Sequence, residues 1–263
     1  MDRGLMPKSY RAPLKQGRWF SLCWLLFAAV AVAEPIKIGA EDDWYPYSGL
    51  RDGEIQGMSV DIVQAAFAAS GTPIELIPYP YSRCMHMAKA GALAACFNTA
   101  PNAEIAKDFL LPTEPLFSGD IQLWARADQQ QTVTSLEQLA GQRVAVTIGY
   151  EYGDSFDRNP LIERIAVRQD LNGFLMLDHQ RVDYTIAYQG TEDQLFRDHP
   201  ELAGHFVPIF SAAQPKLYLS FSRVYPQTAE LRERFDQGMR QIKQNGSYQK
   251  ILQRWQGKET AAQ

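Results

Sequence analysis

Segments typical of strands alternate with segments typical of helices between residues 35 and 255. Short apolar runs such as 93–97 predict buried strands, and apolar residues at helical spacing predict helices such as 58–70. The expected strands are 35–39, 73–78, 93–97, 121–126, 143–147, 164–168, 182–187 and 217–221, and the expected helices are 58–70, 82–89, 135–139, 150–157, 172–180, 192–197, 226–244 and 247–255. This alternation predicts an α/β protein with parallel sheets covered on both faces.

The first 33 residues are typical of a secretory signal peptide. Five basic residues precede the apolar run 20–33, which closes with Ala31-Val32-Ala33. That run has 14 residues, whereas a helix needs roughly 20 to span a bilayer. We therefore expect cleavage after Ala33 and a periplasmic protein, with either Met1 or Met6 as the true start.

The charge of the exported chain excludes one class of partner. Removing the leader's five bases and one acid changes the formal net charge from −4 to −8. Binding nucleic acid without sequence preference requires a basic surface that displaces counterions, so we expect no nucleic-acid partner.

The exported chain keeps two cysteines, Cys84 and Cys96. An oxidising compartment favours a disulfide between them, but two separate small buried side chains remain the alternative.

Signatures of catalysis and of metal binding are missing from the sequence. It contains no glycine-rich phosphate loop, no HExxH, no CxxC and no G-x-S-x-G. The run Cys84-Met85-His86-Met87 offers soft metal ligands, but neighbours on a helix diverge by about 100° and do not all face one ion. The pair Asp42-Asp43 is interpreted as a solvated loop. We therefore expect a protein that is not an enzyme and that holds no metal or cofactor.

Aromatic residues follow three of the expected strands. Trp44, Tyr45 and Tyr47 follow the first strand, Tyr79 and Tyr81 the second, and Tyr150 and Tyr152 a strand in the second half. In a parallel α/β sheet, ligands bind beyond the carboxyl ends of the strands, where these loops lie. The pattern predicts a cleft with aromatic walls.

Six segments in order resemble the bacterial periplasmic solute-binding proteins of the amino-acid-binding type, family 3. They are IKIGAEDDWYPYSG, GEIQGMSVDIVQAAFAASG, YPYSRCMHMAKAGALAACFNTA, LEQLAGQRVAVTIGYEYG, HQRVDYTIAY and LYLSFSRVYPQTAELRERFDQGMRQIKQNGSYQKILQRW. The resemblance implies two lobes, 34–124 with 216–263 and 127–214, joined by crossover strands at 122–126 and 216–221. It also implies ligand capture by hinge closure, in a monomer that serves the membrane permease of an ABC importer.

Two departures from the family concern its charged ligand anchors. The family holds the ligand carboxylate with an arginine in a T-x-T-P-E-R-like segment. Here that position falls on Ile105 or Ala106, and no arginine lies between Arg83 and Arg126. The acid that receives the ligand ammonium is replaced by Tyr188. Arg83 could substitute as an anion anchor, and so could the backbone amides at Gly149-Tyr150, which are expected to begin a helix.

The sequence therefore predicts a binding protein for a small polar or aromatic organic solute. The expected ligand-binding residues are Trp44, Tyr47, Tyr81, Arg83, Asn98, Thr99, Gly149, Tyr150 and Tyr188. Two alternatives use the same scaffold. One is a sensory or interaction module that reports ligand to a membrane receptor, and the other is an exported enzyme resembling the cyclohexadienyl dehydratases. The missing arginine counts against the enzyme, because its substrate also carries a carboxylate.

Overall fold

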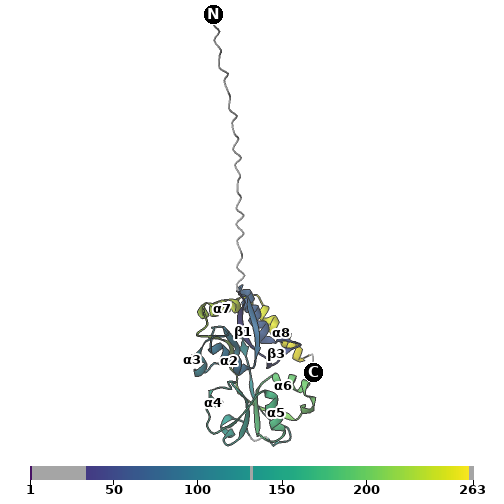
Figure 1. Ribbon diagram of the computed structural model, residues 1–263. Helices are drawn as coiled ribbons and strands as arrows, with labels where there is room; N and C mark the ends of the chain where they lie inside the picture. The colour runs from purple at the N-terminus through teal and green to yellow at the C-terminus, as the bar shows by residue number, and fades with distance from the viewer. Residues whose placement is uncertain (2–33, 131–132, 261–263) are drawn as a thin grey trace. The chain divides into compact units, whose positions relative to one another are not determined.

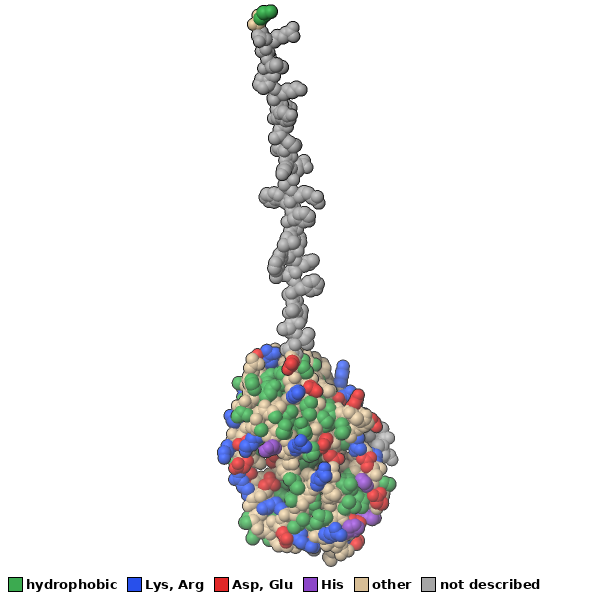
Figure 2. All heavy atoms as spheres, viewed as in Figure 1, with side chains coloured by type: hydrophobic (Ala, Val, Ile, Leu, Met, Phe, Trp, Pro, Cys, Tyr) green, Lys and Arg blue, Asp and Glu red, His purple; other side chains and the backbone are tan. Residues whose placement is uncertain are grey.

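The computed structural model describes residues 1, 34–130 and 133–260, so the predicted signal peptide and its cleavage site lie outside the described residues apart from Met1. Residues 34–263 belong to one compact unit (Figure 1). No helix of the described part is long and apolar enough to cross a membrane. On the face drawn in Figure 2, basic and acidic side chains are interspersed over this unit.

The first of two large sheets is built from both ends of the described chain. Its strand order is β5-β1-β6-β14-β7, and β8 also pairs with β14. β1 runs parallel to β5 and β6, whereas β14 is antiparallel to its neighbours. The strands are β1 (Ile36–Glu41), β5 (Ile74–Tyr79), β6 (Ala95–Thr99), β7 (Phe109–Leu110), β8 (Phe117–Ser118) and β14 (Lys216–Ser222). The helices of this lobe are α1 (Met58–Ala69), α2 (Tyr81–Lys89), α3 (Ala103–Asp108), α7 (Thr228–Gln244) and α8 (Ser247–Thr260).

The second sheet is formed by the middle of the chain. Its order is β11-β10-β12-β9-β13, with β9 antiparallel to both of its neighbours. The strands are β9 (Ile121–Arg126), β10 (Arg143–Thr147), β11 (Glu163–Val167), β12 (Tyr184–Tyr188) and β13 (Phe206–Ala213). The helices are α4 (Asp154–Asp157), α5 (Asp170–Asp178) and α6 (Thr191–Asp198), with 3-10 turns η1 (Leu136–Leu139) and η2 (Pro200–Leu202). We call residues 34–118 with 216–260 the first lobe and residues 121–213 the second lobe.

Two adjacent links connect the lobes. The Gly119 amide donates to the Pro215 carbonyl at 3.0 Å, which holds the outgoing and returning chain together. Gly119 has no room for a side chain, since a Cβ there would lie 2.8 Å from the Tyr188 ring. All six residues of β9 belong to the second sheet. The predicted crossover strands therefore each belong to a single lobe, and the predicted lobe boundary at residue 124 falls inside β9.

Several expected elements differ in the structure. Both sheets are mixed rather than parallel, because β9 and β14 enter them from the interlobe links in the antiparallel sense. The predicted helix 150–157 is only α4, since Gly149 and Gly153 have φ values of +87° and +96° that break the helix before Asp154. A small three-stranded antiparallel sheet of β2 (Asp43–Trp44), β3 (Ser48–Arg51) and β4 (Glu54–Gln56) was not expected. β13 was also not expected; it contains Pro208, and its pairing with β9 has two register shifts.

The apolar residues that occur at helical spacing in the sequence are buried in the core of the first lobe. Val63 and Phe67 of α1 are fully buried, and the Phe67 ring centroid lies 5.4 Å from that of Phe235 on α7. These residues belong to one large apolar cluster. Burial of a side chain of this size contributes about 1.5–3 kcal/mol, which explains why the apolar pattern located these helices well.

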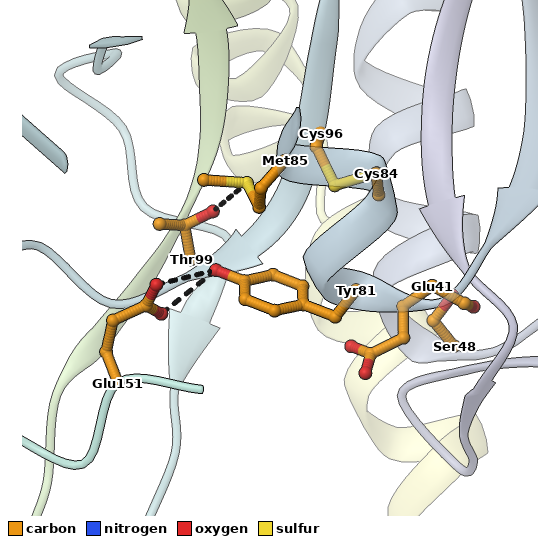
Figure 3. Close-up of a disulfide and its surroundings, with 8 residues drawn as sticks. All are labelled: Glu41, Ser48, Tyr81, Cys84, Met85, Cys96, Thr99 and Glu151. Atoms are coloured by element: carbon orange, nitrogen blue, oxygen red, sulfur yellow. Dashed lines mark hydrogen bonds between the residues drawn. A yellow bond between two sulfur atoms is a disulfide. The ribbon is translucent and has the colours of Figure 1, made fainter. Parts of the chain in front are cut away.

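Cys84 of α2 and Cys96 of β6 are joined by a disulfide (Figure 3). Both residues are 0% exposed, and the bond fastens α2 to the centre of the first sheet. Of the two states that the sequence leaves open, the structure shows the disulfide.

We expect Cys84→Ala/Cys96→Ala to lower the free energy of unfolding by about 2–4 kcal/mol, because a cross-link of this kind restricts the unfolded chain. Urea denaturation measures the change, and chemically reduced wild-type protein is the control that should match it. A loss below about 1 kcal/mol would contradict a structural role for the bond.

Candidate functional site

The loops that follow the strands of both sheets meet between the lobes. Glu41 ends β1, Trp44 lies in the hairpin after it, and Tyr81 begins α2 after β5. From the second lobe, Tyr150 follows β10 and Tyr188 ends β12. These side chains lie at the carboxyl ends of parallel strands, where the backbone changes direction and side chains project into the interlobe space.

Trp44 is the centre of an aromatic cluster contributed by both lobes. Its side chain is 3% exposed. Its ring centroid lies 4.4 Å from that of Tyr47, 5.0 Å from Tyr188 and 6.3 Å from Tyr150. The Tyr150 ring is also edge-on to Tyr81 at 5.4 Å. Aromatic pairs at these separations are favourable, so the cluster contributes to contact between the lobes and forms part of the wall of a cavity.

Two tyrosine–carboxylate pairs cross between the lobes in opposite directions. Tyr81 of the first lobe donates to both oxygens of Glu151 in the second lobe, at 3.1 and 2.9 Å. The Ala100 amide also donates to Glu151 Oε2 at 3.3 Å. In the reverse sense, Tyr150 of the second lobe donates to Glu41 of the first lobe. Figure 3 shows the Tyr81 hydroxyl pointing at the Glu151 carboxylate, with Glu41 on the other side of the Tyr81 ring.

Burial changes the protonation of these carboxyl groups. Desolvation raises the pKa of Glu151 to about 8, against the opposing effect of the Tyr81 and Ala100 hydrogen bonds. Desolvation also raises the pKa of Glu41 well above its ordinary value, and the nearby Asp170 raises it further. The pKa of Asp170 itself is raised to about 6, mainly by burial, although Thr147 donates to it at 2.5 Å. Within the described part of the chain, no cation lowers the pKa of Glu41, Glu151 or Asp170.

A small cavity lies among these side chains. Its volume is about 10 Å³, about the room that one water molecule needs. It is lined by Glu41, Trp44, Tyr81, Asn98, Tyr150, Glu151 and Tyr188. Asn98 is 6% exposed, and its Oδ1 and Nδ2 have no hydrogen-bond partner among the described residues. The indole Nε1 of Trp44 is likewise unpartnered there. Buried polar atoms without partners are rare, so this cavity carries polar groups available to a ligand.

A larger groove opens beside the cavity. It has a volume of about 420 Å³, which is within the range of small-molecule sites. Glu41, Tyr81 and Tyr150 line both the groove and the cavity. Asp42 and Asp43 add two acids to the groove, and Arg168 adds a base. The groove is therefore an acidic approach to the enclosed cavity.

Comparison with known proteins identifies the family of the chain. Residues 36–258 match the family model of the bacterial extracellular solute-binding proteins, family 3. The chain belongs to that family.

A putative ABC transporter arginine-binding protein 2 of Escherichia coli (strain K12) is 22% identical over 238 residues, which cover 86% of this chain and 93% of the relative. Among solved structures, a mutant of ArgBP from T. maritima matches with a TM-score of 0.72 and 17% identity, covering 84% of this chain and 95% of that one. A histidine kinase sensor domain with similarity to periplasmic binding proteins matches with a TM-score of 0.74 and 21% identity, covering 84% and 96%. The two-lobed α/β fold is thereby confirmed for this family 3 protein.

Five of the predicted ligand-binding residues line the cavity: Trp44, Tyr81, Asn98, Tyr150 and Tyr188. Tyr47 stacks behind Trp44 on Phe117, with ring centroids 5.0 Å apart, and its hydroxyl donates to the Gln189 carbonyl at 2.6 Å. Thr99 is buried, and its Oγ1 lies 3.6 Å from the Met85 sulfur.

Two predicted anion anchors lie elsewhere. Arg83 is exposed, with its guanidinium over the Tyr79 ring at 5.3 Å, because it lies on the outer side of α2. Gly149 packs against Ser82, and its loop is not the start of a helix. The proposal of a helix N-terminus at Gly149-Tyr150 is therefore wrong.

The sequence analysis missed the two carboxylates that define the chemistry of the cavity. Glu41 is the last residue of β1, and Glu151 stands between two tyrosines. The position of Glu41 at the carboxyl end of a parallel strand could have indicated that it lies at the site, because ligands bind at such strand ends. The neighbouring Asp42 and Asp43, interpreted as a solvated loop, line the groove. Nothing in the local sequence marks Glu151 as a contact between the lobes, because its partners Tyr81 and Ala100 lie 70 and 51 positions away.

Proposed function

We propose that this protein captures a small polar or aromatic organic solute between its two lobes and delivers it in the periplasm to the permease of an ABC importer. Its curated relatives are binding proteins of ABC transporters. The observation that carries the proposal is the cavity itself. Aromatic rings from both lobes line it together with Asn98, whose buried amide has no hydrogen-bond partner in the described part of the chain.

Capture requires the lobes to separate. The cavity has room for about one water molecule, so a solute enters only when the contacts between Tyr81 and Glu151 and between Tyr150 and Glu41 open. The paired links at Gly119 and Pro215 are the natural hinge, because the lobes are joined there by short connections outside both sheets. Hinge closure around the solute follows the mode of this fold.

The proposed solute is not held by the usual amino-acid clamp. The arginine position is expected to fall on Ile105 or Ala106, and Ile105 is buried in an apolar cluster with Cys84 and Phe109. Tyr188, which occupies the acidic position, donates its hydroxyl to the Glu151 carbonyl at 3.1 Å. Neither position supplies a charge to a ligand, and selectivity must come from the other groups of the cavity.

We expect Asn98→Gly to weaken solute binding by about 10- to 100-fold while changing the melting temperature by no more than a few degrees. The side-chain amide has no hydrogen-bond partner among the residues that the structure describes, and Asn98 has φ +73°, which glycine adopts without strain. The solute is first identified by a thermal-shift screen of amino acids, amines, organic acids and aromatic solutes. At 100 times its Kd a bound ligand adds about 2.7 kcal/mol to stability.

Gln227→Gly is the matched control, because Gln227 also has a positive φ (+58°) and lies at the start of α7. Its affinity for the solute should equal that of the wild type. Unchanged binding in Asn98→Gly would show that the solute does not enter this cavity. No stabilisation by any solute in the screen would contradict the proposed function.

The sensory alternative remains a second candidate because the fold is shared with a histidine kinase sensor domain. Uptake of the labelled solute by cells with and without the gene separates the two. Transport predicts loss of uptake in the deletion, whereas sensing predicts normal uptake. We assign no catalytic step to the site, and recovery of the solute chemically unchanged after incubation is the corresponding check.

A further inference from the structure

The lining of the cavity includes acidic side chains and no basic side chain. Among its lining residues, Glu41 and Glu151 are carboxylic acids, and none is lysine, arginine or histidine. Two arginines of the described residues lie near it but outside its lining: Arg83 is exposed over Tyr79, and Arg168 lines the outer groove. Two desolvated carboxyl groups without a cation in the lining are unfavourable as anions, so a cationic guest would be strongly stabilised there.

Two of the hydrogen-bond donors at the cavity are already engaged by Glu151. The Tyr81 hydroxyl and the Ala100 amide both donate to the Glu151 carboxylate, which bridges from the opposite lobe. A ligand carboxylate would have to displace Glu151 from these donors and then lie beside it. Two carboxyl groups this close do not both ionise, so the ligand carboxylate and Glu151 would compete for a single negative charge.

The remaining groups suit an organic cation. Trp44, Tyr150 and Tyr188 present aromatic rings, which attract cations on their faces. Asn98 Oδ1 is an unpartnered acceptor that can receive an ammonium or guanidinium N–H. Asn98 Nδ2 and Trp44 Nε1 are unpartnered donors, which a hydroxyl on the same solute would satisfy. The adjoining groove, with Asp42 and Asp43, gives cations an attractive path to the cavity.

We propose that the solute is an organic amine or guanidine without a carboxylate, paired with Glu41 and Glu151, and that Glu151 excludes the corresponding amino acids. This inference rests on the proposed function and specifies its ligand class. The raised pKa values of Glu41 and Glu151 agree with it, because both groups are arranged for a positive charge that the protein does not supply.

The test compares pairs of solutes that differ only by a carboxylate. Isothermal titration calorimetry of the purified protein is performed with agmatine and arginine, tyramine and tyrosine, histamine and histidine, and tryptamine and tryptophan. We expect at least one amine to bind at least 100-fold tighter than its amino acid.

Two substitutions at one position separate charge from shape. Glu151→Gln keeps an oxygen for Tyr81 and Ala100 but removes the charge, so amine affinity should fall at least 10-fold without a gain for the amino acid. Glu151→Ala frees the Tyr81 hydroxyl and the Ala100 amide. The ratio of the Kd of the amino acid to the Kd of its amine should therefore fall at least 10-fold. Glu163→Gln, an exposed acid on β11, is the matched control and should change neither affinity. Circular dichroism of each variant establishes that it is folded.

The outcomes also separate the two proposals. If an amino acid binds as tightly as its amine, or if only neutral or anionic solutes bind, the cation inference is wrong and the solute-binding function stands. If folded Glu151→Ala prefers the amine over its amino acid as strongly as the wild type does, Glu151 is not the residue that excludes amino acids. If no solute of any class binds, both the inference and the proposed function fail.

Discussion

Raising the pH from 5 to 9 is expected to lower the free energy of unfolding of the unliganded protein by several kcal/mol. The pKa of Glu151 is raised from 4.5 to about 8 in the folded state, chiefly by burial. Between these values the folded protein binds more protons than the unfolded chain, so stability falls as the pH rises. A shift of this size corresponds to at most about 5 kcal/mol, because one pKa unit is about 1.4 kcal/mol.

The neighbours of Glu151 affect this titration in known directions. Tyr81 and the Ala100 amide lower its pKa by hydrogen bonding, and Asp157 raises it by repulsion. Glu41 contributes in the same direction as Glu151, since burial and the acids Asp170, Asp43 and Asp42 raise its pKa. Separation of the lobes exposes both groups to water, so part of the loss should appear as opening before the lobes unfold.

Urea denaturation at pH 5, 7 and 9 measures the stability, and small-angle X-ray scattering at the same pH values measures the opening as an increased radius of gyration. Glu151→Gln should flatten the pH dependence, whereas the exposed Glu163→Gln should leave it as in the wild type. Stability that rises from pH 5 to pH 9, or an equally steep fall in Glu151→Gln, would show that the Glu151 carboxyl is not buried as described.

Trp44→Ala is expected to lower the free energy of unfolding by about 3–5 kcal/mol, the usual loss when a buried indole is removed. Trp44 is 3% exposed and contacts rings from both lobes, including Tyr47, Tyr150 and Tyr188. The same substitution should weaken solute binding at least 30-fold, because a buried aromatic residue at the centre of an interface is a typical hot spot of about 2 kcal/mol or more.

Affinity is measured by calorimetry at a temperature where the variant is folded, which separates binding from stability. Tyr225→Ala is the control, since Tyr225 packs against the apolar core just after β14. It should lose stability but retain the wild-type Kd for the solute. Equal losses of affinity in the two variants would mean that Trp44 acts only through general stability.

The sequence by itself determined the features that depend on local pattern. The apolar spacing of residues 58–70 located α1, because a helix needs only residues three and four positions apart to form its buried face. The aromatic loops after β1, β5 and β10 were predicted to form a cleft, and five of the nine expected ligand-binding residues do line one cavity. Strand ends in an α/β sheet converge, so their order along the chain carries this information.

The tertiary structure alone decided the charge of the cavity. Glu41 and Tyr150 are 109 positions apart, and Glu151 and Tyr81 are 70 positions apart. Whether an acid is solvated or buried depends on what the opposite lobe places over it, and no local pattern records that. For the same reason Arg83, which was expected to anchor an anion, is exposed, and Glu151, about which nothing was expected, lies between the lobes against Tyr81. The pKa of a carboxyl group is set by its surroundings in three dimensions, because desolvation acts through space and not along the chain.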